Sequence, residues 1–194
     1  MDKLIDALCL KCGMCCNGVL FADVRPEPGD RSPLFHGTSS RVGQPCPAFE
    51  RGTCACSIYA ERPARCRKFE CRQLLGVRAG ATTTENALRR IARARSLAAK
   101  VDRLLAKLGF NEARLPLSRR FRRCQHAAEA GEILTCCSVE PVARMNRRIA
   151  PTLQSKSGHQ PESGKLDTAQ LVCLADLQLA MHELTMLLAR DFYA

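Results

Sequence analysis

Apolar residues recur at helical spacing in the middle of the chain. The pattern over 82–108 has steps of three and four residues, typical of an amphipathic helix, at Leu88, Ile91, Ala94, Ala98, Val101, Leu105 and Leu108. The "TTTE" at 82–85 matches a capping box with Thr82 as the N-cap and Glu85 reaching back. Gly109 fits the position just past a helix end. The pattern predicts one long helix over 82–108.

A second periodic stretch lies near the end of the sequence. Asp167 and Gln170 form a box-like capping pattern. The apolar positions that follow have 3-4-3-4 spacing and are Leu174, Leu177, Met181, Leu184 and Leu188. This seam predicts a helix within 166–194 that packs on the rest of the helical part, and a homodimer through 171–188 is the alternative.

The weaker patterns predict shorter elements. We expect helices around 122–130 and 138–149, and Pro63 suits the first turn of a helix over 63–73. Residues 25–37 hold three prolines and two glycines, which favours an irregular loop.

These elements divide the chain into four parts. We expect a cysteine-cluster lobe at 1–83, a basic helical region at 84–150, a flexible linker at 151–165 and a C-terminal helix at 166–194. The linker, "PTLQSKSGHQPESGK", has the Pro, Ser and Gly content of a flexible connection. The predicted fold class is mainly α, with an irregular, metal-stapled N-terminal lobe followed by a helical part.

Charge is uneven along the chain. The formal net charge is +11, and 84–150 carries 15 basic and 6 acidic side chains. Arginines cluster at 89–90, 118–123 and 147–148, where nucleic acid or an acidic protein partner is one interpretation. Phe121 is the only aromatic residue among these arginines, and bases need aromatic surfaces for stacking. We therefore favour a solvated basic face.

Cysteine is the residue type that points to chemistry. The chain has 13 cysteines, of which nine fall in 1–83: Cys9, Cys12, Cys15, Cys16, Cys46, Cys54, Cys56, Cys66 and Cys71. The N-terminus lacks the apolar run of a signal peptide, and we expect no membrane span and a cytoplasmic location. In a reducing compartment, an odd number of thiols favours metal ligation over disulfides.

The spacing of these cysteines indicates a metal site. The steps 9–12 and 12–15 are both C-x-x-C, which lets a turn present two thiolates to one ion. Zinc and iron–sulfur cores both take four thiolates. Adjacent Cys15 and Cys16 do not easily face one centre, and Cys66 and Cys71 would lie about 140° apart on one helix. Either the chain holds two centres, or the 63–73 helix is broken, or one thiol is structural.

Basic side chains interleave with the last two cysteines. They are Arg62, Arg65, Arg67, Lys68 and Arg72. Four thiolates around zinc or a [4Fe–4S] core leave a site with negative charge. We expect these cations to neutralise it and to lower the pKa of the thiols.

These motifs resemble a known family. "CLKCGMCC", then Cys46, then "CSIYAERPARCRKFEC", are similar to the CxxCxxCC proteins of the YkgJ-like group, described as zinc- or iron-chelating. The resemblance covers about 9–71. It implies eight metal ligands, with Cys54 extra to the pattern, and these are Cys9, Cys12, Cys15, Cys16, Cys46, Cys56, Cys66 and Cys71.

Three functions are compatible with these features. The leading hypothesis is a cytoplasmic metal-binding protein whose cluster chelates zinc or iron, with the metal structural or serving metal handling or protein interaction. The alternative is an iron–sulfur-dependent redox or protein-modifying enzyme, because a flagellin lysine N-methylase with an iron–sulfur centre resembles the cluster too. The third is a metal-stabilised nucleic-acid binder. The sequence has no recognisable catalytic triad, carboxylate pair or phosphate-binding glycine loop.

Four cysteines lie outside the resemblance: Cys124, Cys136, Cys137 and Cys173. Cys124 and His126, together with Cys136 and Cys137, form one candidate for a further metal site. Buried free cysteines in a helical core are the interpretation we favour, because cysteine packs as a small apolar residue.

Overall fold

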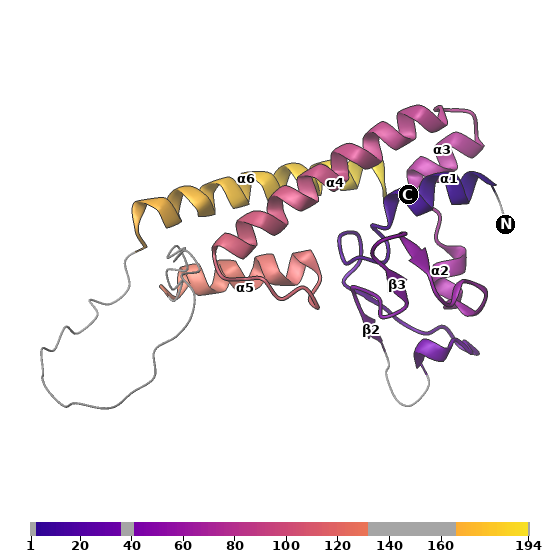
Figure 1. Cartoon of the computed structure of the whole chain (residues 1–194), viewed down its shortest axis with the longest axis horizontal. Coiled ribbons are helices and arrows are strands. Elements are labelled where there is room, and N and C mark those ends of the chain that lie inside the picture. Colours follow the sequence, from indigo (N-terminus) through magenta and orange to yellow (C-terminus); the bar gives the residue numbers. More distant parts are fainter. Residues whose placement is uncertain (1–2, 36–40, 132–165, 194) are drawn as a thin grey trace, which may run out of the picture.

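The computed structural model describes residues 3–35, 41–131 and 166–193. The described part is mainly α-helical, as the sequence predicts (Figure 1). Its α-helices are α1 Lys3–Cys12, α2 Ala64–Lys68, α3 Arg72–Arg78, α4 Thr84–Lys107, α5 Leu117–Glu129 and α6 Thr168–Asp191. Its strands form two antiparallel pairs, β1 Asp23–Val24 with β2 Val42–Gly43, and β3 Phe49–Glu50 with β4 Ala55–Cys56.

Helix α4 is the long helix that the first apolar stripe predicts. Its N-cap is Thr83 rather than the expected Thr82, and the Thr83 hydroxyl accepts a hydrogen bond from the backbone N–H of Asn86. The C-terminal end follows the prediction, because Gly109 adopts a φ of +87°. The backbone N–H of Phe110 donates to the carbonyl of Leu105 at 2.8 Å, so the helix ends in a Schellman motif.

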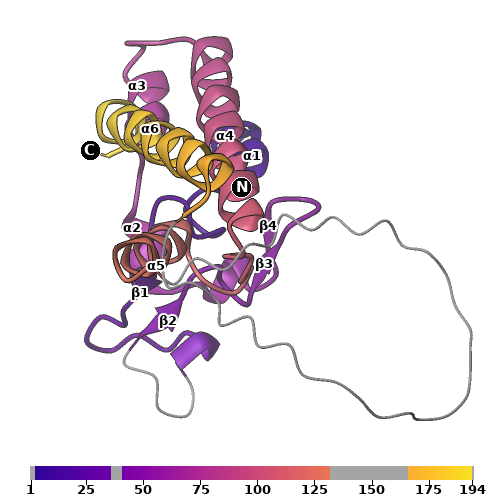
Figure 2. The same ribbon diagram turned by 90° about the vertical axis from the view of Figure 1, so that its left-hand side faces the viewer.

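Helix α6 packs against α4 and crosses it obliquely (Figure 2). Four of its seam residues are buried in this contact, namely Leu174, Leu177, Leu184 and Leu188. Asp167 and Gln170 form the predicted capping box. The apolar seam is therefore used within the chain, and a homodimer could not use the same residues without separating α6 from α4.

Among the described helices, α6 is the one that is long and apolar enough to cross a membrane, by length and composition alone. The expectation that no stretch has this composition was therefore wrong. A core helix of a soluble protein has the same composition, and here one side of α6 is buried against α4.

Helix α5 begins earlier than predicted. It starts at Leu117, directly after Pro116, instead of near residue 122. The backbone N–H of Leu117 donates to the carbonyl of Gly18 at 3.0 Å, which joins the start of α5 to the cysteine-rich lobe. The helix expected at 138–149 and the linker expected at 151–165 lie outside the described residues.

The cysteine-rich lobe consists of loops, short hairpins and helices. Helix α1 was not predicted, because its few apolar residues lie among cysteines that indicated a tight turn. The single helix predicted over 63–73 is wrong, because Phe69 and Cys71 have extended backbones that separate α2 from α3. The Phe69 ring packs edge-on against Phe21 at a centroid distance of 4.9 Å, which stabilises this break.

One hydrophobic core connects the lobe to the helices. It contains Leu8, Met14, Leu20 and Leu74 from the lobe, together with the buried residues of α4, α5 and α6. Helix α4 lies at its centre and contacts α1, α3, α5 and α6. The C-terminal end of α6 lies beside α3 (Figure 1).

Candidate metal centre

The first four cysteines lie on α1 and the turn that follows it. Cys9 and Cys12 are on the last helical turn, and Gly13 ends the helix with a φ of +66°. The backbone N–H of Cys16 donates to the Gly13 carbonyl at 3.0 Å, which closes a tight turn. A Cβ at position 13 would lie 2.9 Å from the Phe49 ring, so the turn requires glycine for its backbone and for space.

Cys71 approaches from the other side of the lobe. It is the N-cap residue of α3, and its carbonyl accepts a hydrogen bond from the backbone N–H of Leu75. The break between α2 and α3 therefore sets Cys71 apart from Cys66, which lies on α2. A broken helix is one of the alternatives that the sequence left open for Cys66 and Cys71.

The remaining ligand candidates gather around Cys16. The backbone N–H of Cys46 donates to the Cys16 carbonyl at 2.8 Å. Cys56 on β4 lies opposite Phe49 on β3, and the Phe49 N–H donates to the Cys46 carbonyl at 3.0 Å. Backbone hydrogen bonds thus hold the segments of Cys16, Cys46 and Cys56 together.

The electrostatic interactions among the thiols divide them into two sets. Cys9 and Cys71 raise the pKa of both Cys12 and Cys15. Cys46, Cys56 and Cys66 raise the pKa of Cys16, to which Cys9 adds a smaller effect, and Cys46 and Cys56 raise that of Cys66. We call Cys9, Cys12, Cys15 and Cys71 the first set, and Cys16, Cys46, Cys56 and Cys66 the second set. Adjacent Cys15 and Cys16 fall in different sets, although Cys16 also raises the pKa of Cys15.

The pKa is raised at five of these thiols, namely Cys12, Cys15, Cys16, Cys46 and Cys66. Burial is the main cause, and it raises the pKa of Cys12 and of Cys16 to about 12 and that of Cys66 to about 11. Neighbouring thiols add to the effect. The pKa of Cys15 lies well above its ordinary value for the same reasons.

The expected lowering of thiol pKa values by cations was wrong for these residues. Arg62 lowers the pKa of Cys66 and Arg95 lowers that of Cys12, but burial outweighs both. Other cations have different partners. Arg65 and Lys68 pair with Glu27, and Arg72 donates to the carbonyl of Arg190.

The donor chemistry of each set fits a metal, although the side chains do not yet converge. Four thiols are the ligand set of structural zinc and of iron–sulfur clusters. Among the described residues, no three Cys, His, Asp or Glu side chains lie close enough together to coordinate a metal ion in their present conformations. The thiols of a set would have to move inward and lose their protons on binding, as metal sites that fold with their metal do.

Cys54 differs from the eight predicted ligands. It sits in the turn between β3 and β4 with a φ of +55°, and the position of a Cβ on Gly13 would be 3.1 Å from its sulfur. Cys54 is not among the thiols described as raising the pKa of Cys16, Cys46 or Cys66, whereas Cys56 raises the pKa of all three. The choice of Cys56 rather than Cys54 as a ligand remains a prediction.

The further site suggested around Cys124 does not form from the described residues. Cys124 is fully buried, while His126 is exposed and pairs with Glu129. Burial and the nearby Cys173 raise the pKa of Cys124 to about 11. Cys136 and Cys137 lie outside the described residues. Cys124 thus packs as an apolar core residue, which is the interpretation favoured from the sequence.

The arginine cluster at 118–123 is not a uniform basic face. Arg120 is buried, pairs with Asp102 and donates to the carbonyl of Phe110 at 2.7 and 2.9 Å. It joins α5 to α4 and the residues that follow α4. Arg119, Arg122 and Arg123 remain exposed, and Arg123 pairs with Glu112.

One residue near the first set was missed from the sequence. The Tyr193 hydroxyl donates to the carbonyl of Leu20 at 2.8 Å, and burial together with the Cys15 thiol raises the pKa of Tyr193. No local pattern could have found this residue, because more than 170 positions separate Leu20 from Tyr193.

Comparison with known proteins identifies the lobe. Residues 8–90 match the model of the CxxCxxCC family, which bears the description "Putative zinc- or iron-chelating domain". No curated protein and no solved structure matches the chain significantly. All eight predicted ligands lie within the matched range. The resemblance noted in the sequence is thus confirmed: residues 8–90 are similar to the CxxCxxCC family model described as a "Putative zinc- or iron-chelating domain".

Proposed function

We propose that the lobe binds two metal centres, each through four cysteine thiolates. The first centre uses Cys9, Cys12, Cys15 and Cys71, and the second uses Cys16, Cys46, Cys56 and Cys66. The observation that carries this proposal is that Cys9, Cys12 and Cys71 lie close enough to raise the pKa of Cys15, while Cys46, Cys56 and Cys66 do the same for Cys16, although Cys16 and Cys9 also act across the two sets. The family match supports zinc or iron as the metal.

In this proposal the metal organises the lobe. The described parts of the lobe contain few long helices, and their strands are two residues long. Four-thiolate zinc binding supplies about 10–16 kcal/mol in small peptides, enough to order such a segment. The metal-loaded lobe then serves metal handling or protein interaction in the cytoplasm, with α4 as a rigid support.

A series of single serine variants tests the division into two centres. Protein purified without oxygen is analysed for metal, sulfide and protein content. We expect Cys12→Ser and Cys16→Ser each to lose one centre and to keep the other. Cys54→Ser is the matched control and should keep both centres.

A simultaneous loss of both centres in each variant would point to one shared centre. Full metal content in Cys12→Ser and Cys16→Ser would refute ligation by these residues. Either result would overturn the assignment.

An iron–sulfur protein is the second candidate. The observation that favours it is the adjacency of Cys15 and Cys16, which places the two sets side by side and would bring two redox centres close together. Two [4Fe–4S] clusters would need the same eight thiolates. Brown protein with absorbance that bleaches on reduction, and with stoichiometric sulfide, would select this candidate. Colourless protein containing zinc would exclude it.

A further inference from the structure

The end of helix α6 reaches the first set of thiols. We call Asp191, Phe192 and Tyr193 the 191–193 segment. Phe192 is fully buried in the shared core, so the segment is anchored. It lies between the start of α3, which carries Cys71, and the turn that follows Cys15.

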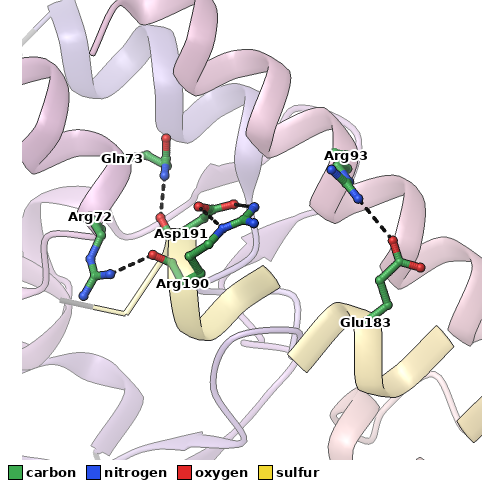
Figure 3. A network of polar contacts seen from close by, with 6 residues as sticks. All are labelled: Arg72, Gln73, Arg93, Glu183, Arg190 and Asp191. Atoms are coloured by element: carbon green, nitrogen blue, oxygen red, sulfur yellow. Dashed lines mark hydrogen bonds and ion pairs between the residues drawn. The ribbon is translucent and has the colours of Figure 1, made fainter. Parts of the chain in front are cut away.

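On one side, the segment holds the residues next to Cys71. The backbone N–H of Arg72 donates to the carbonyl of Phe192 at 3.1 Å. The side-chain amide of Gln73 donates to the backbone carbonyl of Asp191, and the guanidinium of Arg72 donates to the backbone carbonyl of Arg190 (Figure 3). The first two residues of α3 are thus tied to the end of α6.

On the other side, the segment holds the turn after Cys15. The Tyr193 hydroxyl donates to the carbonyl of Leu20, whose own N–H donates to the carbonyl of Met14 at 3.0 Å. The Tyr193 ring also lies edge-on to Phe21 at a centroid distance of 6.4 Å. Because Met14 directly precedes Cys15, these contacts connect Tyr193 to the backbone next to the Cys15 thiol.

We propose that the 191–193 segment positions the ligands of the first metal centre. It bridges the two pieces of chain, 9–15 and 71–73, that contribute all four thiols of that centre. Filling the centre would stabilise the docked segment, and docking would raise the metal affinity of that centre by the same factor, because linkage between two binding equilibria is reciprocal. This inference rests on the proposed first centre of Cys9, Cys12, Cys15 and Cys71.

We expect the coupling to be stronger for the first centre than for the second. The hydrogen bonds described for the 191–193 segment reach Leu20, Arg72, Gln73 and the preceding turn of α6. The second set is held instead by the Cys16–Cys46 backbone bond and the β3–β4 pair. Loosening the segment should therefore release metal from the first centre before the second.

The test uses a double variant, Gln73→Leu with Tyr193→Phe. Both changes keep buried apolar volume, and Gln73→Leu also removes a side-chain oxygen that is buried without a hydrogen-bond partner. Tyr59→Phe removes a hydroxyl in the second half of the lobe and serves as the matched control. Metal-loaded proteins are challenged with a chelator, and the freed cysteines are alkylated and identified by mass spectrometry.

We expect the double variant to lose metal from the first centre roughly ten-fold faster, which corresponds to about one net hydrogen bond. Cys9, Cys12, Cys15 and Cys71 should become alkylated early, while Cys16, Cys46, Cys56 and Cys66 follow the control. Equal release rates in the double variant and control would overturn the inference and leave the two centres standing. Equal acceleration at both centres would also overturn it, because general destabilisation would explain it.

Wild-type protein without alkylation protection at either set would refute the proposed function instead. A second measurement covers the reverse direction of the linkage. Hydrogen exchange of the Phe192 and Tyr193 amides, which both bond to the Leu188 carbonyl, should slow when metal is added to metal-free protein. Exchange that does not respond to metal would contradict the coupling.

Discussion

Single residues set the chemistry of the lobe through burial. Cys12 is 8% exposed, and burial raises its pKa from about 9 to about 12. A metal-free fold that holds the thiol protonated loses stability when the pH favours the thiolate. The same thiol becomes a strong metal ligand once a cation offsets the cost of burying its charge.

The first prediction concerns alkaline pH. The folded thiol binds its proton more tightly than the unfolded one, so its contribution is complete below pH 9 and is lost as the pH rises toward 12. We expect about 1 kcal/mol of destabilisation from Cys12 at pH 10. Limited proteolysis between pH 8 and 10.5 should show the metal-free lobe opening and the metal-loaded lobe unchanged. Equal behaviour of both forms would contradict this prediction.

The second prediction concerns Gly13. Gly13→Ala should destabilise the lobe by roughly 1–3 kcal/mol, since alanine disfavours a φ of +66° and its Cβ would press on the Phe49 ring. Gly80→Ala is the matched control, because Gly80 has a φ of +69° with no atom within 4 Å of an added Cβ. Denaturant unfolding of both variants separates the two effects. A loss no greater for Gly13→Ala than for Gly80→Ala would show that Phe49 moves aside freely.

At this scale, the sequence predicts the candidate ligands but not their grouping. Cys9, Cys12 and Cys15 share one set through local spacing, and Cys71 joins them only through the packing of α3 against α1. The direction of the pKa shifts also depends on burial, which spacing does not reveal. The prediction that arginines lower these pKa values failed for that reason.

At the scale of elements, the two long helices follow from their sequence patterns. Most positions of the α4 stripe and of the α6 seam are buried where the spacing predicts, while Leu88 and Met181 are only partly buried. Helix α1 was missed because Leu4, Leu8 and Cys12 form too short a stripe to stand out. The break at Phe69–Cys71 was not predictable locally, because it depends on the ring of Phe21, which comes from a distant segment.

The third prediction concerns the cap of α6. Asp167→Ala should cost about 1 kcal/mol of stability, because the carboxylate accepts a hydrogen bond from the backbone N–H of Gln170 at 2.7 Å. Asp176→Ala, an exposed change in the same helix, is the control and should stay within about 0.5 kcal/mol. Urea unfolding followed by circular dichroism measures both. Similar losses in the two variants would mean that the cap contributes little.

At the scale of the whole molecule, one core joins two parts that differ in what holds them. The long helices bury Leu105, Leu177 and Leu184, all at most 1% exposed, and need no metal. The loops of the lobe are held by backbone hydrogen bonds and by side-chain contacts such as that of Phe21 with Phe69, to which the proposed centres would add. Because Leu8 and Met14 share the core with α4, the lobe has a fixed platform on which to form.

The fourth prediction follows from this division. Cys12→Ser should make the lobe sensitive to limited proteolysis while α4, α5 and α6 keep their helical signal. Cys54→Ser should digest like the wild type. An unchanged digestion pattern in Cys12→Ser would mean that apolar burial alone holds the lobe.

The most direct test of the account is the sulfur coordination of the metal in protein purified without oxygen. X-ray absorption at the zinc or iron edge, combined with elemental analysis, reports the ligands and the number of centres. The account predicts two centres per chain, each with four cysteine sulfurs at about 2.3 Å from the metal. A metal-free chain whose lobe still resists proteolysis, or a metal bound mainly by oxygen and nitrogen, would contradict it.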